Sequence, residues 1–211
     1  MSRNPATSVV LIGDLIGSRD VIERSDLHRR LSSALEDVNG RWGTDLRITA
    51  GDEYQGTVPS LGAASAITLA LRLSLLPTHD VRHGIARGAT AVLDAGSQIE
   101  DGPGWWAARA AIDTAERRAV RAATRSSRTA YRSADPDEPV GAVEAAFLAR
   151  DELVGRLDAR SLSVLRGLMS ARTQRDLAED QGVSASAISQ RIRRDGIGVV
   201  VSMSEWLEGQ P

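Results

Sequence analysis

This chain of 211 residues contains no cysteine and no lysine, and only 3% of its residues are aromatic. Without cysteine it can form neither a disulfide, nor a thiolate nucleophile, nor a cysteine-ligated zinc site. Without lysine it can hold neither the lysine of a Walker-type phosphate loop nor a Schiff base, so all 26 basic residues are arginine. The three histidines, His28, His79 and His83, show no ligand spacing, and we interpret them as surface or ordinary core residues.

Long hydrophobic runs are also missing. The first apolar run, Val9–Ile12, is soon followed by Asp14 and is too short for a signal peptide or a membrane span. The net charge of -2 predicts no general attraction to nucleic acid, so any such contact needs a local basic patch. The hydrophobic content of 42% suffices for one large or two small packed domains. We therefore expect a cytoplasmic protein with no membrane partner.

Two short acidic turns carry the first functional signal. Asp14 follows the strand-like run Val9–Ile12, and Asp52 follows the alternating segment 46–50 at the tip of a predicted hairpin. If the two strands are neighbours, the two carboxylates lie side by side at one edge of a sheet. Close carboxylates raise one another's pKa or share a cation, so we expect a site for Mg²⁺ or Mn²⁺. The alternative is that each aspartate only caps a turn or the following helix.

The order of predicted elements indicates the fold of the N-terminal part. The pattern predicts a strand over 9–12, a helix ending near Asn39–Gly40, a hairpin over 46–58, a helix from Ser60 to Leu75 and a strand over 81–88. Within the last strand, Gly84, Ala86 and Gly88 give one smooth face. This βαββαβ order predicts an α+β, ferredoxin-like palm with helices covering one face of the sheet.

A third helix is predicted from Trp105 towards Arg118. Beyond it, arginines recur either along a helix or on a short edge strand over 127–133. The polar, proline-punctuated segment 134–139 is typical of a linker. We therefore predict a palm domain over residues 1–136 and a second, all-α domain over residues 141–211.

The C-terminal part shows helix, turn and helix signals. Thr173 is placed to cap a helix over 174–180, and the turn Gly182–Ser184 leads into a helix over 185–194. This run resembles the helix-turn-helix of sigma-factor-like and MarR-like bacterial regulators, and the resemblance implies binding to duplex DNA.

Groove geometry then indicates which side chains would face DNA. We expect contributions from residues of the two helices and the turn between them: Thr173, Ser184, Ser186, Ser189, Gln190, Arg191, Arg193 and Arg194. Gln190 would reach adenine, and the arginines would reach phosphate or guanine. The alternative is a module used only for dimerisation or protein docking. Because acids and arginines are about equally numerous over 141–211, we expect a monomer to bind DNA weakly.

The combination of motifs resembles the SatD family of bacterial proteins over nearly the full chain. The four segments that carry the resemblance are Gly13–Arg19, Gly51–Gly56, Arg82–Gly88 and Asp101–Trp106. This resemblance implies a C-terminal helix-turn-helix and does not imply a particular activity.

The same segments are similar to the palm of class III nucleotide cyclases and, less closely, of diguanylate cyclases. That likeness implies that Asp14 and Asp52 hold two metal ions that bind a triphosphate. It also implies nucleotide contacts from Ile16, Gly17, Ser18, Arg19 and Arg82, and a transition-state role for Arg109. Asp14, Asp52 and Arg109 are therefore the candidate catalytic residues.

Three departures from the cyclase pattern bear on catalysis. Trp105 replaces an asparagine that orients the ribose, no lysine exists to read a purine, and Ala50 replaces a glycine of diguanylate cyclases. A site that keeps its carboxylates but loses orienting groups favours binding over turnover. Trp105 and Trp106 either stack on a base or anchor a core or a dimer.

The sequence thus predicts a homodimeric, DNA-binding bacterial regulator. Its palm would bind a metal-nucleotide, either a nucleoside triphosphate or a nucleotide second messenger, or would mediate dimerisation. The first alternative is an active nucleotidyl cyclase-like enzyme that uses two metal ions. The second alternative is a purely structural palm.

Overall fold

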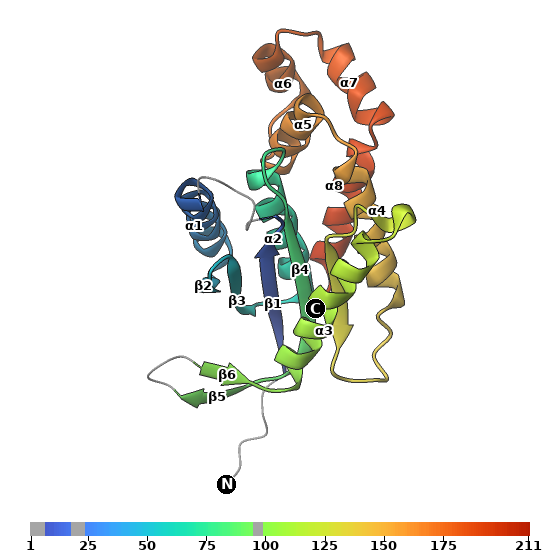
Figure 1. Cartoon of the computed structure of the whole chain (residues 1–211). Coiled ribbons are helices and arrows are strands. Elements are labelled where there is room, and N and C mark those ends of the chain that lie inside the picture. Colours follow the sequence, from blue (N-terminus) through green and yellow to red (C-terminus); the bar gives the residue numbers. More distant parts are fainter. Residues whose placement is uncertain (1–6, 18–23, 95–98) are drawn as a thin grey trace.

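The computed structural model describes residues 7–17, 24–94 and 99–211 (Figure 1). It is a mixed α+β fold built on a five-stranded sheet in the order β2-β3-β1-β4-β7. The strands are β1 (Thr7–Leu15), β2 (Arg47–Ala50), β3 (Glu53–Val58), β4 (Val81–Ala89) and β7 (Thr129–Ser133). β1 runs antiparallel to β3 and β4, and β7 is added parallel to β4.

Helices cover both faces of this sheet. Leu11 and Leu15 of β1 point to one face and share a core with α1 (Arg24–Trp42) and α2 (Leu61–Leu75). Val10 and Ile12 point to the other face and pack against α3 (Pro103–Ala119). The order β1-α1-β2-β3-α2-β4 is the predicted one, but the prediction that helices cover only one face is wrong, because α3 packs on the second.

Several element ends differ from the sequence prediction. α1 continues past Gly40 and ends at Trp42. It ends there because Gly43, with φ 64°, reverses the chain. Asn39 stays inside the helix and accepts hydrogen bonds from the amide of Leu46 and the hydroxyl of Thr44, at 2.9 and 2.8 Å. The arginines after α3 do not continue a helix, since a short 3₁₀ turn, η2 (Ala122–Thr124), leads into β7.

A second, two-stranded sheet lies between β4 and α3. Its strands, β5 (Ala91–Asp94) and β6 (Ile99–Asp101), extend away from the body of the molecule (Figure 1). Val92 and Leu93 are exposed there.

Five helices follow β7: α4 (Gly141–Gly155), α5 (Ala159–Met169), α6 (Gln174–Gln181), α7 (Ala185–Arg194) and α8 (Ile197–Glu208). Thr173 and Ser184 cap α6 and α7, and Gly182 forms the turn with φ 63°. The helix pair is thus present, but a separate helix-turn-helix domain is not confirmed, because Leu69 and Leu73 of α2 share a core cluster with these helices. The boundary between residues 136 and 141 stays a prediction. Within the described residues, no helix is both long enough and apolar enough to span a membrane.

Candidate functional site

Three charged side chains form a row across neighbouring strands at one end of the sheet. Glu53 of β3 lies directly opposite Asp14 of β1, and Asp14 lies directly opposite Arg82 of β4. Side chains at paired positions of antiparallel strands share a face, and here that face is the one packed against α3. The guanidinium of Arg82 donates to both carboxylate oxygens of Asp14, at 3.1 and 2.8 Å.

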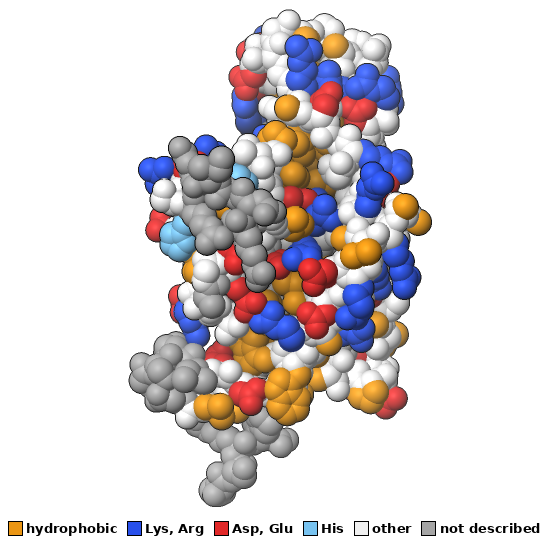
Figure 2. Space-filling model, viewed as in Figure 1, with side chains coloured by type: hydrophobic (Ala, Val, Ile, Leu, Met, Phe, Trp, Pro, Cys, Tyr) orange, Lys and Arg blue, Asp and Glu red, His pale blue; other side chains and the backbone are white. Residues whose placement is uncertain are grey.

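α3 adds two more charges to this row. Arg109 donates to both carboxylate oxygens of Glu53, at 2.8 and 2.6 Å, and Glu116 accepts a hydrogen bond of 2.6 Å from Arg82. We call Asp14, Glu53, Arg82, Arg109 and Glu116 the sheet-end cluster. Figure 2 shows acidic and basic side chains interspersed over the middle of this face of the molecule.

Both arginines of the sheet-end cluster hold their protons firmly. Partial burial lowers the pKa of Arg82, but the hydrogen bonds and negative charges of Asp14 and Glu116 raise it by more. The pKa of Arg82 therefore lies above its ordinary value. Hydrogen bonding to Glu53 raises the pKa of Arg109. The cluster therefore presents two permanent positive charges on side chains that are part-exposed.

Asp52 lies one residue before Glu53, in the turn that Gly51 makes with φ 62°. β1 and β3 are neighbours, and their register places Glu53 directly opposite Asp14 and Asp52 one residue further into the turn, so the shared cation site of Asp14 and Asp52 stays a prediction. Within the described ranges, no three His, Asp or Glu side chains are grouped as a complete metal site. Two carboxylates still fit Mg²⁺, which usually keeps several waters and shares its ligands with substrate phosphates.

The predicted phosphate loop is described only in part. The amide of Ile16 donates to the carbonyl oxygen of Asp80 at 2.9 Å, so this amide is already engaged. Gly17 adopts φ 71°, while Ser18 and Arg19 lie outside the described residues. The described part of α1 begins at Arg24, six residues after Ser18.

The two adjacent tryptophans have different environments. Trp105 is buried against Val10 and Ile12, so it belongs to the core. Trp106 is 63% exposed, and its indole donates to Asp101 at 2.7 Å. Of the alternatives left open for the two tryptophans, Trp105 takes the core one, while Trp106 points in a different direction because successive residues of a helix lie on different sides of it.

The predicted DNA-facing residues are spread over α6, α7 and their caps. The side chains of Thr173 and Ser184 accept hydrogen bonds as helix caps. Arg191 donates to Ser161 at 3.0 Å and lies by Asp158, and Arg194 donates to Asp195 at 2.7 Å. Of the remaining predicted residues, Ser186, Gln190 and Arg193 are exposed, and Ser189 is half-buried.

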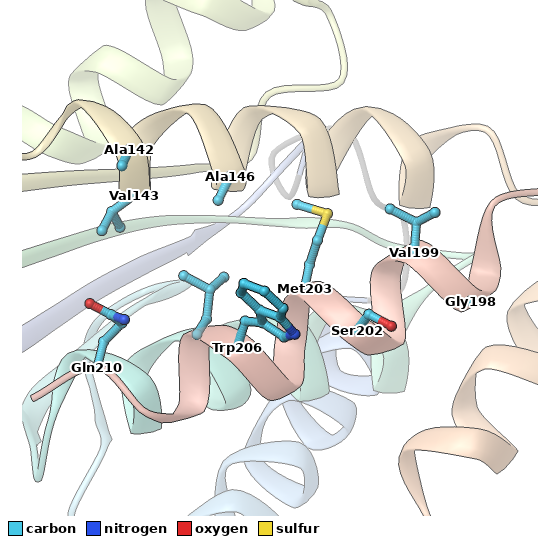
Figure 3. A pocket seen from close by; sticks show the side chains of 10 residues that line it. Ala142, Val143, Ala146, Gly198, Val199, Ser202, Met203, Trp206 and Gln210 are labelled. Atoms are coloured by element: carbon cyan, nitrogen blue, oxygen red, sulfur yellow. The ribbon is translucent and has the colours of Figure 1, made fainter.

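An apolar groove of about 620 Å³ lies between α4 and α8, away from the sheet-end cluster. Figure 3 shows Met203, Trp206 and Val199 of α8 facing Ala146 and Val143 of α4. No charged side chain lines this groove, so it lacks the groups needed to bind phosphates.

The sheet-end cluster contains residues that sequence reasoning missed. Glu53 was visible within the second acidic turn, but its place opposite Asp14 depends on the hairpin register. Glu116 gives no sequence signal beyond its position on a helix. His83, interpreted as an ordinary core residue, is fully buried and bonded to Tyr54.

The SatD family profile matches residues 8–205, and the chain belongs to this family. Similar solved structures include the guanylyl cyclase Cya2, at 15% identity over 54% of this chain and 73% of that one, with a TM-score of 0.45. The guanylate cyclase domain of RhGC from Catenaria anguillulae in complex with GTP is 18% identical over 54% of this chain and 75% of that one, with a TM-score of 0.44. The adenylate/guanylate cyclase/hydrolase from Silicibacter pomeroyi is 21% identical over 50% of this chain and 68% of that one, with a TM-score of 0.40. A search of curated proteins found no match.

The prediction of a DNA-binding regulator is wrong. The similar solved structures reported above carry the names of guanylyl and adenylate/guanylate cyclases. Inside the chain, Arg191 and Arg194 lie against the carboxylates of Asp158 and Asp195. Two of the three arginines on which the prediction depended are thus paired with acids of the same chain, which weakens their attraction for phosphate.

Proposed function

We propose that this chain binds a nucleoside triphosphate and a divalent cation at the sheet-end cluster and transfers the nucleotidyl group to a ribose hydroxyl. The hydroxyl oxygen attacks the α-phosphorus and gives up its proton, and the bond to the β-phosphate breaks with release of pyrophosphate. The observation that carries the proposal is the row Glu53–Asp14–Arg82, which Arg109 joins from α3. Asp14, Arg82 and Arg109 are the positions that the motifs shared with class III cyclases assign to metal, nucleotide and transition-state charge. The structure supports the proposal by bringing all three to one end of one sheet.

The charge of the site makes a cation necessary. The three acids of the sheet-end cluster, Asp14, Glu53 and Glu116, outnumber its two arginines, which leaves an excess of one negative charge. A triphosphate is itself strongly negative, so it would be repelled by this site without added positive charge. We therefore expect nucleotide binding to depend on Mg²⁺ or Mn²⁺.

Asp14 and Asp52 would hold the cation, jointly with the phosphate oxygens. When bound, a divalent cation neutralises phosphate charge and activates a hydroxyl for attack on phosphorus. Arg82 holds the Asp14 carboxylate in a fixed orientation through its paired hydrogen bonds. Arg109, which is 48% exposed, is placed to leave Glu53 and stabilise negative charge on the transferring group.

The buried position of Trp105 bears on the rate. The cyclase-like pattern has an orienting asparagine at this position, whereas this indole packs into the core. Positioning supplies a large part of enzymatic rate, so we expect the nucleotide to be bound but turned over slowly.

The homodimer also stays a prediction, and exposed Trp106 beside the β5–β6 hairpin is its proposed anchor.

The test combines binding with product analysis. Wild-type protein is incubated with each of the four ribonucleoside triphosphates and Mg²⁺ or Mn²⁺, and products are identified by mass spectrometry. At least one pair should raise the melting temperature and give a cyclic or linked product, because a ligand of the native state stabilises it. Asp14→Asn should abolish the thermal shift, and Arg109→Ala should lower product formation about 100-fold or more.

Arg117→Ala is the matched control. Arg117 lies on the same helix and is exposed, and its guanidinium donates to the hydroxyl of Thr114 at 2.9 Å. This variant should keep the thermal shift and the product of the wild type. An absent shift and absent product in the wild type, or an undiminished shift in Asp14→Asn, would overturn the proposal.

A further inference from the structure

A second row of three residues crosses the same strands on the opposite face of the sheet. Tyr54 of β3 lies directly opposite Gly13 of β1, and Gly13 lies directly opposite His83 of β4. Each member is the chain neighbour of one member of the charged row, because Gly13 precedes Asp14, Tyr54 follows Glu53, and His83 follows Arg82.

Tyr54 and His83 are joined across Gly13. The phenol oxygen of Tyr54 lies 2.6 Å from Nε2 of His83, and both side chains are fully buried. The tyrosine ring occupies the space of the missing Gly13 side chain, since a Cβ there would lie 2.3 Å from the ring. Only glycine therefore lets the bridge pass directly over β1.

The bridge is uncharged at neutral pH. Burial, followed by the positive charges of Arg150 and Arg72, holds the pKa of His83 well below its ordinary value. Burial, followed by the charges of Asp14 and Asp80, holds the pKa of Tyr54 well above its ordinary value. A protonated phenol beside a neutral imidazole gives a stable hydrogen bond that needs no counter-ion.

We propose that the Tyr54–His83 bridge is a positioning device that aligns Asp14 with Glu53 and Arg82. This inference rests on the proposed nucleotide site. Successive residues of a strand point to opposite faces, so holding three strands together at Tyr54, Gly13 and His83 also fixes the neighbouring row on the other face. Tyr54 and His83 act through the backbone and touch no substrate.

The binding test uses Tyr54→Phe, which removes the hydroxyl and keeps the ring. The apparent Kd for the nucleotide–cation pair should rise about tenfold, while the fold is retained. Tyr131→Phe is the matched control, because Tyr131 is equally buried in the same core and its hydroxyl donates to Glu138 at 2.6 Å, away from the cluster. His83→Asn, which removes the bond from its other side, should show the same loss as Tyr54→Phe.

A second measurement does not depend on nucleotide binding. The coupling between Asp14 and Arg82 is measured by a double-mutant cycle of thermal unfolding, with alanine at each position, in the wild-type and Tyr54→Phe backgrounds. The coupling should fall by at least half in the Tyr54→Phe background. If the wild type binds no nucleotide, the proposed function fails and this cycle alone decides the inference. Unchanged coupling, or a Tyr54→Phe Kd equal to that of Tyr131→Phe, would overturn it.

Discussion

Buried charge is the most unusual property of individual residues in this chain. Arg72, Arg150 and Asp151 are all fully buried, and Arg72 donates to Asp151 at 3.0 Å. Asp151 also accepts the amide hydrogens of Arg128 and Thr129, at 2.7 and 2.6 Å. Such groups are tolerated in a core only when they are paired and hydrogen-bonded. The positive charges of this group help to keep His83 neutral.

The neutral state of His83 predicts how stability depends on pH. Its pKa in the folded protein lies below that in the unfolded chain, so the unfolded chain binds the extra proton first. The stability from neutral His83 is complete above about pH 6.5 and is lost as pH falls below it. We expect the free energy of unfolding to fall by up to about 1.4 kcal/mol per pH unit below that point.

Urea unfolding between pH 7.5 and 5 measures this dependence. The His83→Asn variant is less stable at pH 7.5 but should lose clearly less stability across the same range. Parallel curves for the wild type and His83→Asn would show that another group carries the titration.

At the scale of elements, close contact between α3 and β4 holds the site together. A Cβ on Gly84 would lie 2.2 Å from the carbonyl oxygen of Ala108, and one on Gly88 would lie 2.7 Å from Cα of Gly104. The smooth face of glycines and alanine predicted for this strand is thus the surface on which α3 lies. Because α3 carries Arg109 and Glu116, its distance from the sheet sets the geometry of the sheet-end cluster.

Gly84→Ala should therefore destabilise the protein and loosen the site. We expect a loss of about 1–3 kcal/mol in the free energy of unfolding, typical of an overpacked core. Gly40→Ala is the matched control, because Gly40 lies inside α1 with nothing within 4 Å of the added Cβ. Gly40→Ala should raise the free energy of unfolding by roughly 0.5–1 kcal/mol. Calorimetry of both variants gives the comparison, and equal effects would contradict this account of α3.

At the scale of the whole molecule, the C-terminal helices interlock with the sheet-bearing part. Arg72 of α2 needs Asp151 of α4, and Leu69 and Leu73 of α2 pack among α5 to α8. The chain then returns to the start of α2, where the amide of Gly62 donates to the carbonyl oxygen of Gln210 at 3.1 Å. The two predicted domains therefore share cores and ion pairs.

A fragment of residues 1–140 should consequently fail to fold cooperatively. It would leave the charge of Arg72 without Asp151 and would expose the outer leucines of α2, which costs several kcal/mol. Urea unfolding followed by circular dichroism measures this, with the full chain as the control showing one transition. A cooperative transition of the fragment at the same midpoint as the full chain would instead establish an independent palm domain.

The sequence by itself indicated the order of the first six elements, the helix pair α6 and α7, and the place of Asp14 near the end of β1. Alternation, helical spacing, caps such as Thr173 and turn glycines such as Gly182 act over a few residues, so they can be recognised without a fold. The same local signals placed Arg82 on a strand and Arg109 on a helix.

Only the tertiary structure decided which of these residues meet. The hairpin register placed Glu53 rather than Asp52 opposite Asp14. Just after β1, the amide of Ile16 donates a hydrogen bond to the carbonyl oxygen of Asp80. Helix spacing on α7 predicted DNA recognition, whereas the fold pairs Arg191 and Arg194 with acids of the same chain. The physical reason is distance along the chain. The bond from Arg82 to Asp14 joins residues 68 positions apart, and local preferences carry no information about partners so far away.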